Sequence, residues 1–205
     1  MNEAHIVIDC SGGMLEMGKA AAISGIASAA FCYASHVLAP MGGAGLLRVY
    51  DWKNRIYEIR SPDELQFGGG RASLDKLAEA IMSLSGRQAS VLVATDGIFG
   101  QGDIDAFRRK ASEYGVPVSW IACGADADIK TLSELSCCCG MAFGAEGIAA
   151  ALQMAFFPLD PLQPKAKKVP ESGSAQDDVQ GEWQHAAAPA AVADKTDSED
   201  APGEA

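Results

Sequence analysis

Two short stretches of the sequence place carboxylates and hydroxyls where oxygen chemistry could occur. The stretch HIVIDCSGG runs from four residues that suit a buried strand into Asp9 and Ser11, followed by Gly12 and Gly13. The stretch SVLVATDG ends in a similar way, with Asp96 close behind an apolar run. Such oxygen donors could hold a metal ion, take part in catalysis, or only cap the start of the next helix.

A third stretch, GGGRASL, adds a hydroxyl to this set. Its three glycines precede Ser73 and a helix-like pattern of apolar residues. In a parallel α/β sheet, ligands gather outside the carboxyl ends of the strands, so these groups are expected to converge at one edge. The expected oxygen donors are Asp9, Ser11, Ser73 and Asp96. A set made of oxygen donors suits a hard divalent cation such as Mg²⁺.

The elements that position these residues alternate along the chain. Apolar patterns predict strands over 5–9, 46–50, 55–59, 90–97 and 117–122, with a last strand at the CCC run, Cys137–Cys139. Helical spacing predicts helices over 17–37, 73–84, 104–114, 129–135 and 147–156. The short turn DWKN makes 46–50 and 55–59 an antiparallel hairpin. The pattern predicts an α/β fold with a doubly wound, mostly parallel central sheet, one antiparallel edge strand and helices on both faces.

This arrangement resembles the von Willebrand factor A (VWA) domain family, which carries a metal-ion-dependent adhesion site. In that family the first strand ends in Asp-x-Ser-x-Ser, a middle loop supplies a threonine, and a later strand ends in Asp, often as Thr-Asp-Gly. Here DCSGG supplies Asp9 and Ser11, and VATDG supplies Asp96. The resemblance covers residues 4 to 157 and implies a Rossmann-like VWA fold.

The sequence departs from the family's metal-binding pattern at two positions. Gly13 stands where the second serine belongs, and Ala72 stands at the threonine position, with Ser73 one residue further on. The resemblance therefore implies a degenerate adhesion site, at which Mg²⁺ binding is weakened or lost.

Composition excludes some functions. The net charge of −11 argues against nucleic-acid binding, which usually shows a basic patch. We expect no transmembrane helix and no signal peptide, and therefore a cytoplasmic protein without membrane contact. The six cysteines include no CxxC pair, so reduced packing residues are expected rather than a structural zinc site.

The composition changes after residue 157. Residues 158–205 are rich in Pro, Ala, Gly, Ser and acidic residues, and Trp183 is their only large aromatic residue. Such a segment cannot bury enough apolar surface to fold, so we predict a VWA-like domain over 1–157 and a disordered acidic tail over 158–205.

Two classes of function fit these patterns. The first is a non-enzymatic protein-interaction module, with Met14, Ile98 and Phe99 as apolar anchors beside the polar cluster. The resemblance implies a protein partner such as an AAA+ ATPase of the MoxR type, or a bacterial stress or defence assembly. The second class is a small hydrolase or phosphotransfer enzyme that uses Asp9 or Cys10 at the strand end. Ser11, where dehalogenase-like enzymes would need a second Asp, argues against this class.

Overall fold

The computed structural model describes residues 1–111 and 113–157. The predicted acidic tail and Trp183 lie outside the described residues. All statements below refer to the described part of the chain.

A mixed six-stranded sheet forms the centre of the fold, in the order β3-β2-β1-β4-β5-β6. Its strands are β1 (Glu3–Asp9), β2 (Leu47–Trp52), β3 (Ile56–Ile59), β4 (Ala89–Thr95), β5 (Val118–Ala122) and β6 (Ala142–Gly144). All neighbouring pairs are parallel except β2 and β3, which form the predicted antiparallel hairpin at one edge. The predicted fold class is confirmed.

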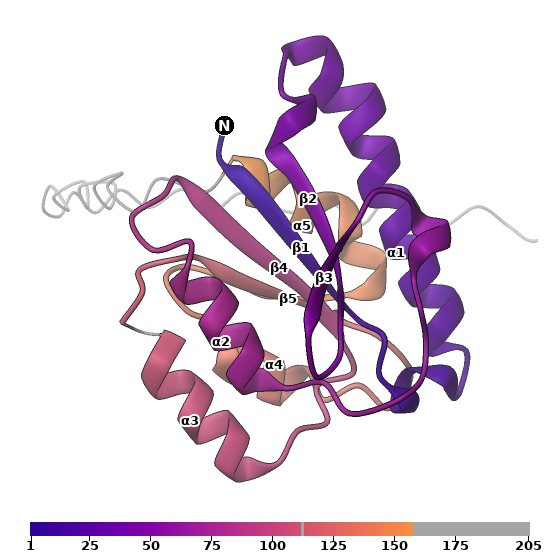
Figure 1. Cartoon of the computed structure of the whole chain (residues 1–205), viewed down its shortest axis with the longest axis vertical. Coiled ribbons are helices and arrows are strands. Elements are labelled where there is room, and N and C mark those ends of the chain that lie inside the picture. Colours follow the sequence, from indigo (N-terminus) through magenta and orange to yellow (C-terminus); the bar gives the residue numbers. More distant parts are fainter. Residues whose placement is uncertain (112, 158–205) are drawn as a thin grey trace, which may run out of the picture. The chain divides into compact units, whose positions relative to one another are not determined.

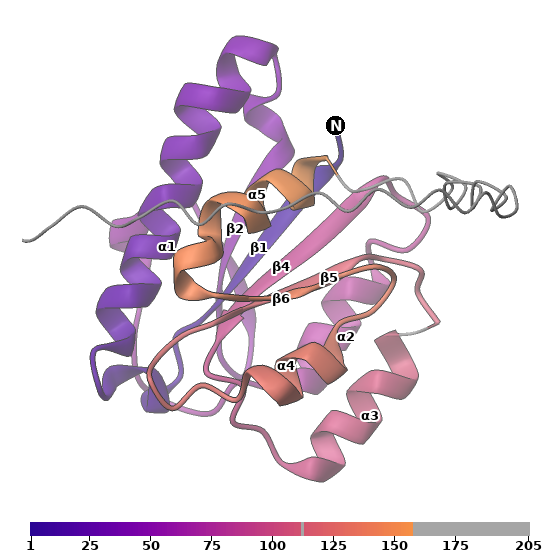
Figure 2. The same cartoon turned by 180° about the vertical axis from the view of Figure 1, so that it is seen from behind.

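Helices cover both faces of the sheet, as Figures 1 and 2 show from opposite sides. They are α1 (Lys19–Tyr33), α2 (Leu74–Met82), α3 (Gln101–Ala111), α4 (Ile129–Leu135) and α5 (Ile148–Phe156). The apolar side chains of α2, α3 and α4 share one buried cluster with Trp52 and Trp120, whereas α1 and α5 enclose a second cluster around Ile6 and Ile8. Buried apolar faces on both sides of the sheet supply most of the driving force for this arrangement.

The strand order reverses between β1 and β4. After β1 the chain builds β2 and β3 on one side, and it then crosses to β4, β5 and β6 on the other. In Figure 1 both β1 and β4 run toward the lower right, and the loops that follow them gather there. Connections that diverge at such a point leave a crevice outside the carboxyl ends of the two strands. Asp9 ends β1 and Asp96 directly follows β4, so both carboxylates lie at this point.

The CCC run is not a strand, which corrects the prediction for Cys137–Cys139. Cys137 makes only an isolated bridge with Val118, and the last strand is β6. Cys138 and Cys139 have positive φ angles of 51° and 70°. This left-handed backbone turns the chain, and the amide of Gly140 then donates to the carbonyl of Cys137 at 2.9 Å. The turn brings the chain close against β5 before β6 begins.

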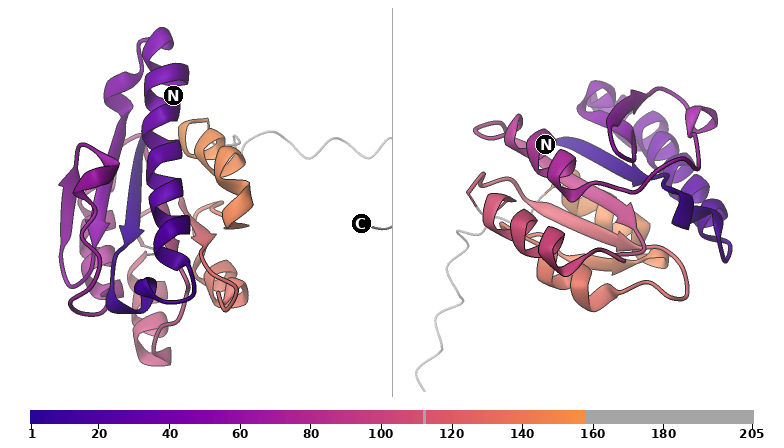
Figure 3. Two further views of the ribbon diagram at one scale, coloured as in Figure 1. Left: turned by 90° about the vertical axis from the view of Figure 1, so that its right-hand side faces the viewer. Right: turned by 60° about the horizontal axis from the view of Figure 1, so that its bottom comes forward.

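Helix α1 belongs to a longer helical run, Lys19–Met41, that is long and apolar enough to cross a membrane by length and composition alone. This finding differs from the sequence expectation that no such helix exists. The inner face of α1, with Ile23, Ile26 and Ala27, is buried against the sheet, as in a core helix. The end of the run reaches beyond the strands (Figures 1 and 3).

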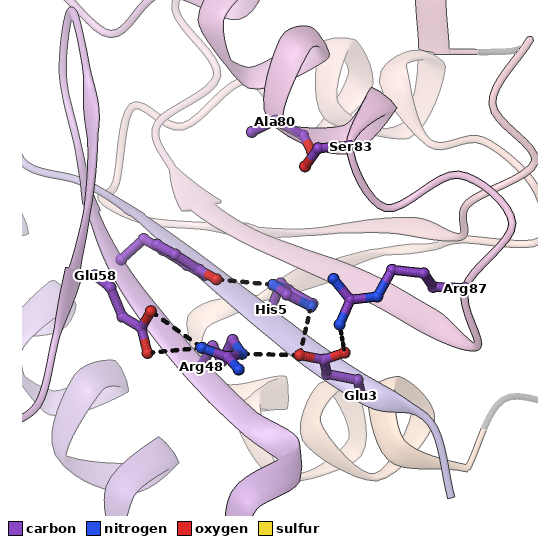
Figure 4. A network of polar contacts seen from close by, with 8 residues as sticks. Glu3, His5, Arg48, Glu58, Ala80, Ser83 and Arg87 are labelled. Carbon is purple, nitrogen blue, oxygen red and sulfur yellow. Dashed lines mark hydrogen bonds and ion pairs between the residues drawn. The ribbon is translucent and has the colours of Figure 1, made fainter.

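The amino ends of the parallel strands are held by a polar network, shown in Figure 4. Glu3 on β1 accepts hydrogen bonds from Arg48 on β2 and from Arg87 before β4. His5 is buried, stacks on Tyr50 and exchanges a hydrogen bond of 3.0 Å with its hydroxyl. Burial lowers the pKa of His5, although Glu3 opposes the shift. The network ties neighbouring strands together at the end opposite to Asp9 and Asp96.

Candidate functional site

Asp9 is held rigidly at the carboxyl end of β1. One carboxylate oxygen accepts the amide of Ser11 at 2.9 Å, and the other accepts the hydroxyl of Thr95 at 2.7 Å. The residue is only 2% exposed. Burial raises the pKa of Asp9, and the hydrogen bonds from Ser11 and Thr95 counteract part of that rise. The side chain therefore joins the ends of β1 and β4 and does not cap a helix.

Asp96 lies beside Asp9 in the loop after β4. Its Oδ1 accepts the amide of Ile98 at 3.1 Å, which closes a local turn. Its Oδ2 accepts a hydrogen bond of 2.8 Å from Nζ of Lys19. The predicted strand-end carboxylates do come to one edge, and a side chain from α1 pairs with Asp96 there.

Lys19 is the first residue of α1 and the cation of this site. Its Nζ donates to Oδ2 of Asp96 and to Oδ2 of Asp126, each at 2.8 Å, and its side chain is 3% exposed. Burial by itself would lower the pKa of Lys19, but the hydrogen bonds and charges of Asp126 and Asp96 outweigh burial and raise it. The ammonium is therefore charged at neutral pH and is shared by two carboxylates.

The backbone around Lys19 is shaped to admit its side chain. Met17 has a φ of 51°, unusual for a non-glycine residue, and Gly18 follows with a φ of 76°. Gly124, after β5, has a φ of 106°, and a Cβ built on it would lie 2.8 Å from Cε of Lys19. Only glycine combines this conformation with that space. Gly124 therefore leaves room for the lysine side chain.

The two predicted serine ligands already have other partners. Ser73 is the N-cap of α2, and its hydroxyl accepts the amide of Lys76 at 3.3 Å. Ser11 is buried and hydrogen-bonds the Asp9 carboxylate through its amide, with a further side-chain contact to the same group. Both serines lie at the predicted edge of the sheet, but their hydrogen bonds hold the protein backbone and the Asp9 side chain in place.

A pocket of about 460 Å³ opens at this edge of the sheet. It is lined by Asp9, Ser11, Ser73 and Asp96 together with Lys19. Its acidic lining residues are Asp9, Glu16, Asp75, Asp96, Asp103 and Asp126. The basic ones are Lys19 and Arg71, so acidic groups are in excess, although Asp96 and Asp126 share the charge of Lys19 and Asp75 pairs with Lys110.

The three predicted apolar anchors differ in exposure. Ile98 is 57% exposed at the pocket, as expected for an anchor. Phe99 is half-buried, because its ring packs against Trp52 and Trp120 with ring centroids 6.1 and 6.4 Å away. The expectation that Met14 is exposed is wrong: this side chain is 0% exposed and belongs to the core beneath α1. The short 3-10 helix Gly12–Leu15 turns Met14 inward.

Cys10 is poorly placed to act as a nucleophile. The residue is 0% exposed and packs in the cluster between α1 and the sheet. Burial and the nearby carboxylates of Asp51 and Asp9 raise the pKa of its thiol far above the ordinary value. A protonated, inaccessible thiol cannot attack a substrate at neutral pH.

Sequence reasoning missed three residues of this site: Lys19, Thr95 and Asp126. Lys19 is the only Lys, Arg, Asp or Glu in the apolar stretch 19–41, but the sequence does not mark it as buried, and only a buried lysine requires a charged partner. Asp126 follows β5 at the same sheet edge as Asp96, so the rule that located Asp96 applies to it as well. Thr95 was within the quoted VATDG motif, and its hydroxyl points to Asp9.

The residues present do not fit a divalent metal site. Oδ2 of Asp96 is bonded to an ammonium, Ser73 caps a helix, and Gly13 offers no hydroxyl. Within residues 1–111 and 113–157, no group of three or more His, Cys, Asp or Glu side chains is arranged to hold a metal ion. The contacts of Lys19 instead supply the positive charge that the carboxylates require.

The ion pair predicts a specific acid response. The hydrogen bond and charge of Lys19 hold the pKa of the Asp126 carboxyl below its ordinary value of 3.8. A lowered acid pKa stabilises the fold above the ordinary value, and this stabilisation is lost as the pH falls through the folded-state pKa. We expect Asp126→Asn to show a smaller loss of melting temperature than the wild type below about pH 4. Thermal unfolding of both proteins across the acid range measures this difference, and parallel curves would contradict the pairing.

Comparison with known proteins finds matches to the fold among solved structures only. No protein-family model and no curated protein matches the chain. Among solved structures, an aerotolerance-related membrane protein from Bacteroides fragilis aligns with a TM-score of 0.53 at 13% identity, over 77% of this chain and 98% of that one. Proximal thread matrix protein 1 from the mussel byssus aligns with a TM-score of 0.53 at 13% identity, over 76% of this chain and 47% of that one.

A second structure of the mussel protein, described as having a zinc-occupied MIDAS motif, aligns with a TM-score of 0.51 at 12% identity, over 76% of this chain and 47% of that one. At sequence identities of 12–13%, the similarity to these structures shows a shared fold and nothing more. The described chain has a VWA-like fold, as the sequence resemblance predicted.

Proposed function

We propose that this domain is a non-enzymatic protein-interaction module that docks its partner at the strand-end edge. The observation that supports the proposal best is the acidic pocket of about 460 Å³ at that edge, with the exposed Ile98 on its rim. An apolar side chain beside a polar cluster is a common arrangement in protein interfaces. Loops on a rigid sheet are also where binding residues concentrate.

The contacts at the edge favour docking over catalysis. Both oxygens of Asp9 accept hydrogen bonds, one from the amide of Ser11 and one from Thr95 at the end of β4, and the thiol of Cys10 is buried and protonated. Neither group has the exposure that a nucleophile needs. The alternative of a hydrolase or phosphotransfer enzyme is therefore the weaker proposal.

The charge of the pocket selects the kind of partner. Its acidic lining would repel an acidic peptide and attract a segment that presents Lys or Arg. The partner we propose is thus a protein with an exposed basic segment, held in the cytoplasm together with this domain. An AAA+ ATPase of the MoxR type is the first candidate, because stand-alone domains resembling this one often serve such ATPases as adaptors.

The test places a photo-activated cross-linking amino acid at position 98 or, as a control, at Met82. Both side chains are exposed and apolar, but Met82 lies at the end of α2 and does not line the pocket. We expect the candidate ATPase to be cross-linked from position 98 and not from position 82. Cross-linking from position 82 alone would place the interface elsewhere.

A binding measurement with the cross-linked partner gives the size of the effect. Ile98→Ser removes the apolar contact without adding charge and is expected to weaken binding by about tenfold or more, which corresponds to about 1.4 kcal/mol. Met82→Ser should leave the affinity unchanged. Raising the salt concentration should weaken the wild-type complex, because charge attraction between exposed groups is screened. Equal effects of the two substitutions would contradict docking at this edge.

A further inference from the structure

We propose that the ammonium of Lys19 is the permanent cation of this site and replaces a divalent metal ion. The carboxylate of Asp96, which a metal would need, has its Oδ2 hydrogen-bonded to Lys19 at 2.8 Å. The same ammonium reaches Asp126 at 2.8 Å. The inference rests on these contacts and does not depend on the proposed docking function.

The location of the ammonium is the first argument. Lys19 is 3% exposed and lies between carboxylates that come from the loops after β4 and β5. A metal ion bound to Asp96 would lie next to a fixed positive charge in a poorly solvated place. Like charges in such surroundings repel strongly, so the lysine and the metal exclude each other.

The second argument is that the fold is built around the lysine side chain. A Cβ on Gly124 would come within 2.8 Å of Cε and 2.9 Å of Cγ of Lys19. The left-handed backbone at Met17 and Gly18 immediately precedes the lysine at the start of α1. The positive φ of Met17, which is not a glycine, is strained, and such strain persists where the surrounding structure requires it. The side chain is therefore an integral part of the site and not a surface lysine that has folded inward.

The third argument concerns the remaining ligands. Gly13 and Ala72 bring no oxygen from their side chains, and the hydroxyl of Ser73 accepts a bond from the backbone of α2. The loss of hydroxyl donors and the presence of an ammonium are consistent with each other. An ammonium needs only acceptors for its three protons, whereas Mg²⁺ or Mn²⁺ here would need the carboxylates that Lys19 occupies, with several waters completing a shell of about six oxygens.

The test compares the response of wild type and Lys19→Ala to Mn²⁺ and Mg²⁺ in thermal unfolding. The wild type is expected to show no metal-dependent change in melting temperature. Lys19→Ala frees Asp96 and Asp126, and we expect millimolar Mn²⁺ to raise its melting temperature by ~4 °C or more, because an ion that binds only the folded state stabilises it. A purely structural lysine would give destabilisation without this gain.

Two controls make the result specific. Lys130→Ala removes an exposed lysine from the first turn of α4 and should show no metal response. The double variant Lys19→Ala with Asp96→Asn should lose the response gained by Lys19→Ala. A folded Lys19→Ala protein that does not respond to either metal would overturn the proposal.

A second measurement covers the case in which Lys19→Ala does not fold. Electron paramagnetic resonance of Mn²⁺ added to the wild type reports how much of the ion stays free. We expect the signal of free Mn²⁺ to persist at micromolar protein. A loss of signal that Asp96→Asn restores would overturn the proposal. That outcome would leave docking at the edge untouched, because docking is measured separately by cross-linking at position 98.

Discussion

Replacing Lys19 with methionine is expected to lower the free energy of unfolding by about 3 kcal/mol, because the substitution leaves the buried carboxylate of Asp96 without its charged partner. Methionine keeps most of the length of the side chain, so the change is mainly one of charge. Asp96 loses the hydrogen bond to its Oδ2, and its side chain is only 11% exposed. Urea unfolding at neutral pH measures the change.

A double-mutant cycle separates the ion pair from the packing of the lysine stem. Asp96→Asn in the Lys19→Met background removes the unpaired charge and should recover about 1 kcal/mol or more. Lys130→Met, at an exposed site, should change stability by less than about 0.5 kcal/mol. If Lys19→Met behaved like Lys130→Met, the contacts of Lys19 would not be important for stability.

Gly140→Ala is expected to be comparably damaging, at about 3 kcal/mol, through overpacking against a backbone that cannot move. A Cβ on Gly140 would overlap with the carbonyl oxygen of Val118 on β5. The turn formed by Cys137 to Gly140 would have to move away from the strand, and β6 would lose its register. Chemical unfolding of the variant gives the magnitude.

Gly25→Ala is the matched control, since it makes the same chemical change in an open place. Gly25 lies on the exposed side of α1, where an added Cβ would meet nothing within 4 Å. Alanine in a helix interior should stabilise the protein by about 0.5–1 kcal/mol. We expect Gly140→Ala to lower the stability of the protein and Gly25→Ala to raise it. A neutral Gly140→Ala would mean that this turn is not packed against β5 as described.

The sheet could be predicted because its strands carry strong local patterns. Residues of β4 are buried on both faces, and the sequence shows this as the unbroken apolar run 91–94 in the middle of the strand. The turn at Cys138 and Cys139 could not be predicted in the same way. Their left-handed conformations are usually marked by Gly or Asn, and cysteine gives no such signal. The last strand was therefore placed too early in the chain.

The candidate site could be predicted in part. The rule that strand ends share an edge placed Asp9 and Asp96 correctly, because both line the same pocket. The partner of Asp96 is Lys19, which is 77 residues away in sequence and starts a helix on one face of the sheet. No local pattern encodes a contact of that range. The inward turn of Met14 also depends on the backbone of one short 3-10 helix, which hydrophobic patterns do not specify.

The attachment of the Lys19 ammonium to the chain has a consequence for regulation. A covalently attached group faces its partner at a fixed, high effective concentration that dilution cannot change. A chelator or a change in the supply of free ions affects a site only if the cation of that site can dissociate. The cation at this edge is part of the chain and cannot dissociate. The single positive charge of Lys19 is therefore shared by Asp96 and Asp126 from the moment the domain folds, and the three groups together keep one net negative charge. A partner that binds this edge would therefore find the same surface at every concentration of free metal ions. The time at which it binds would be set by the partner's own abundance or state.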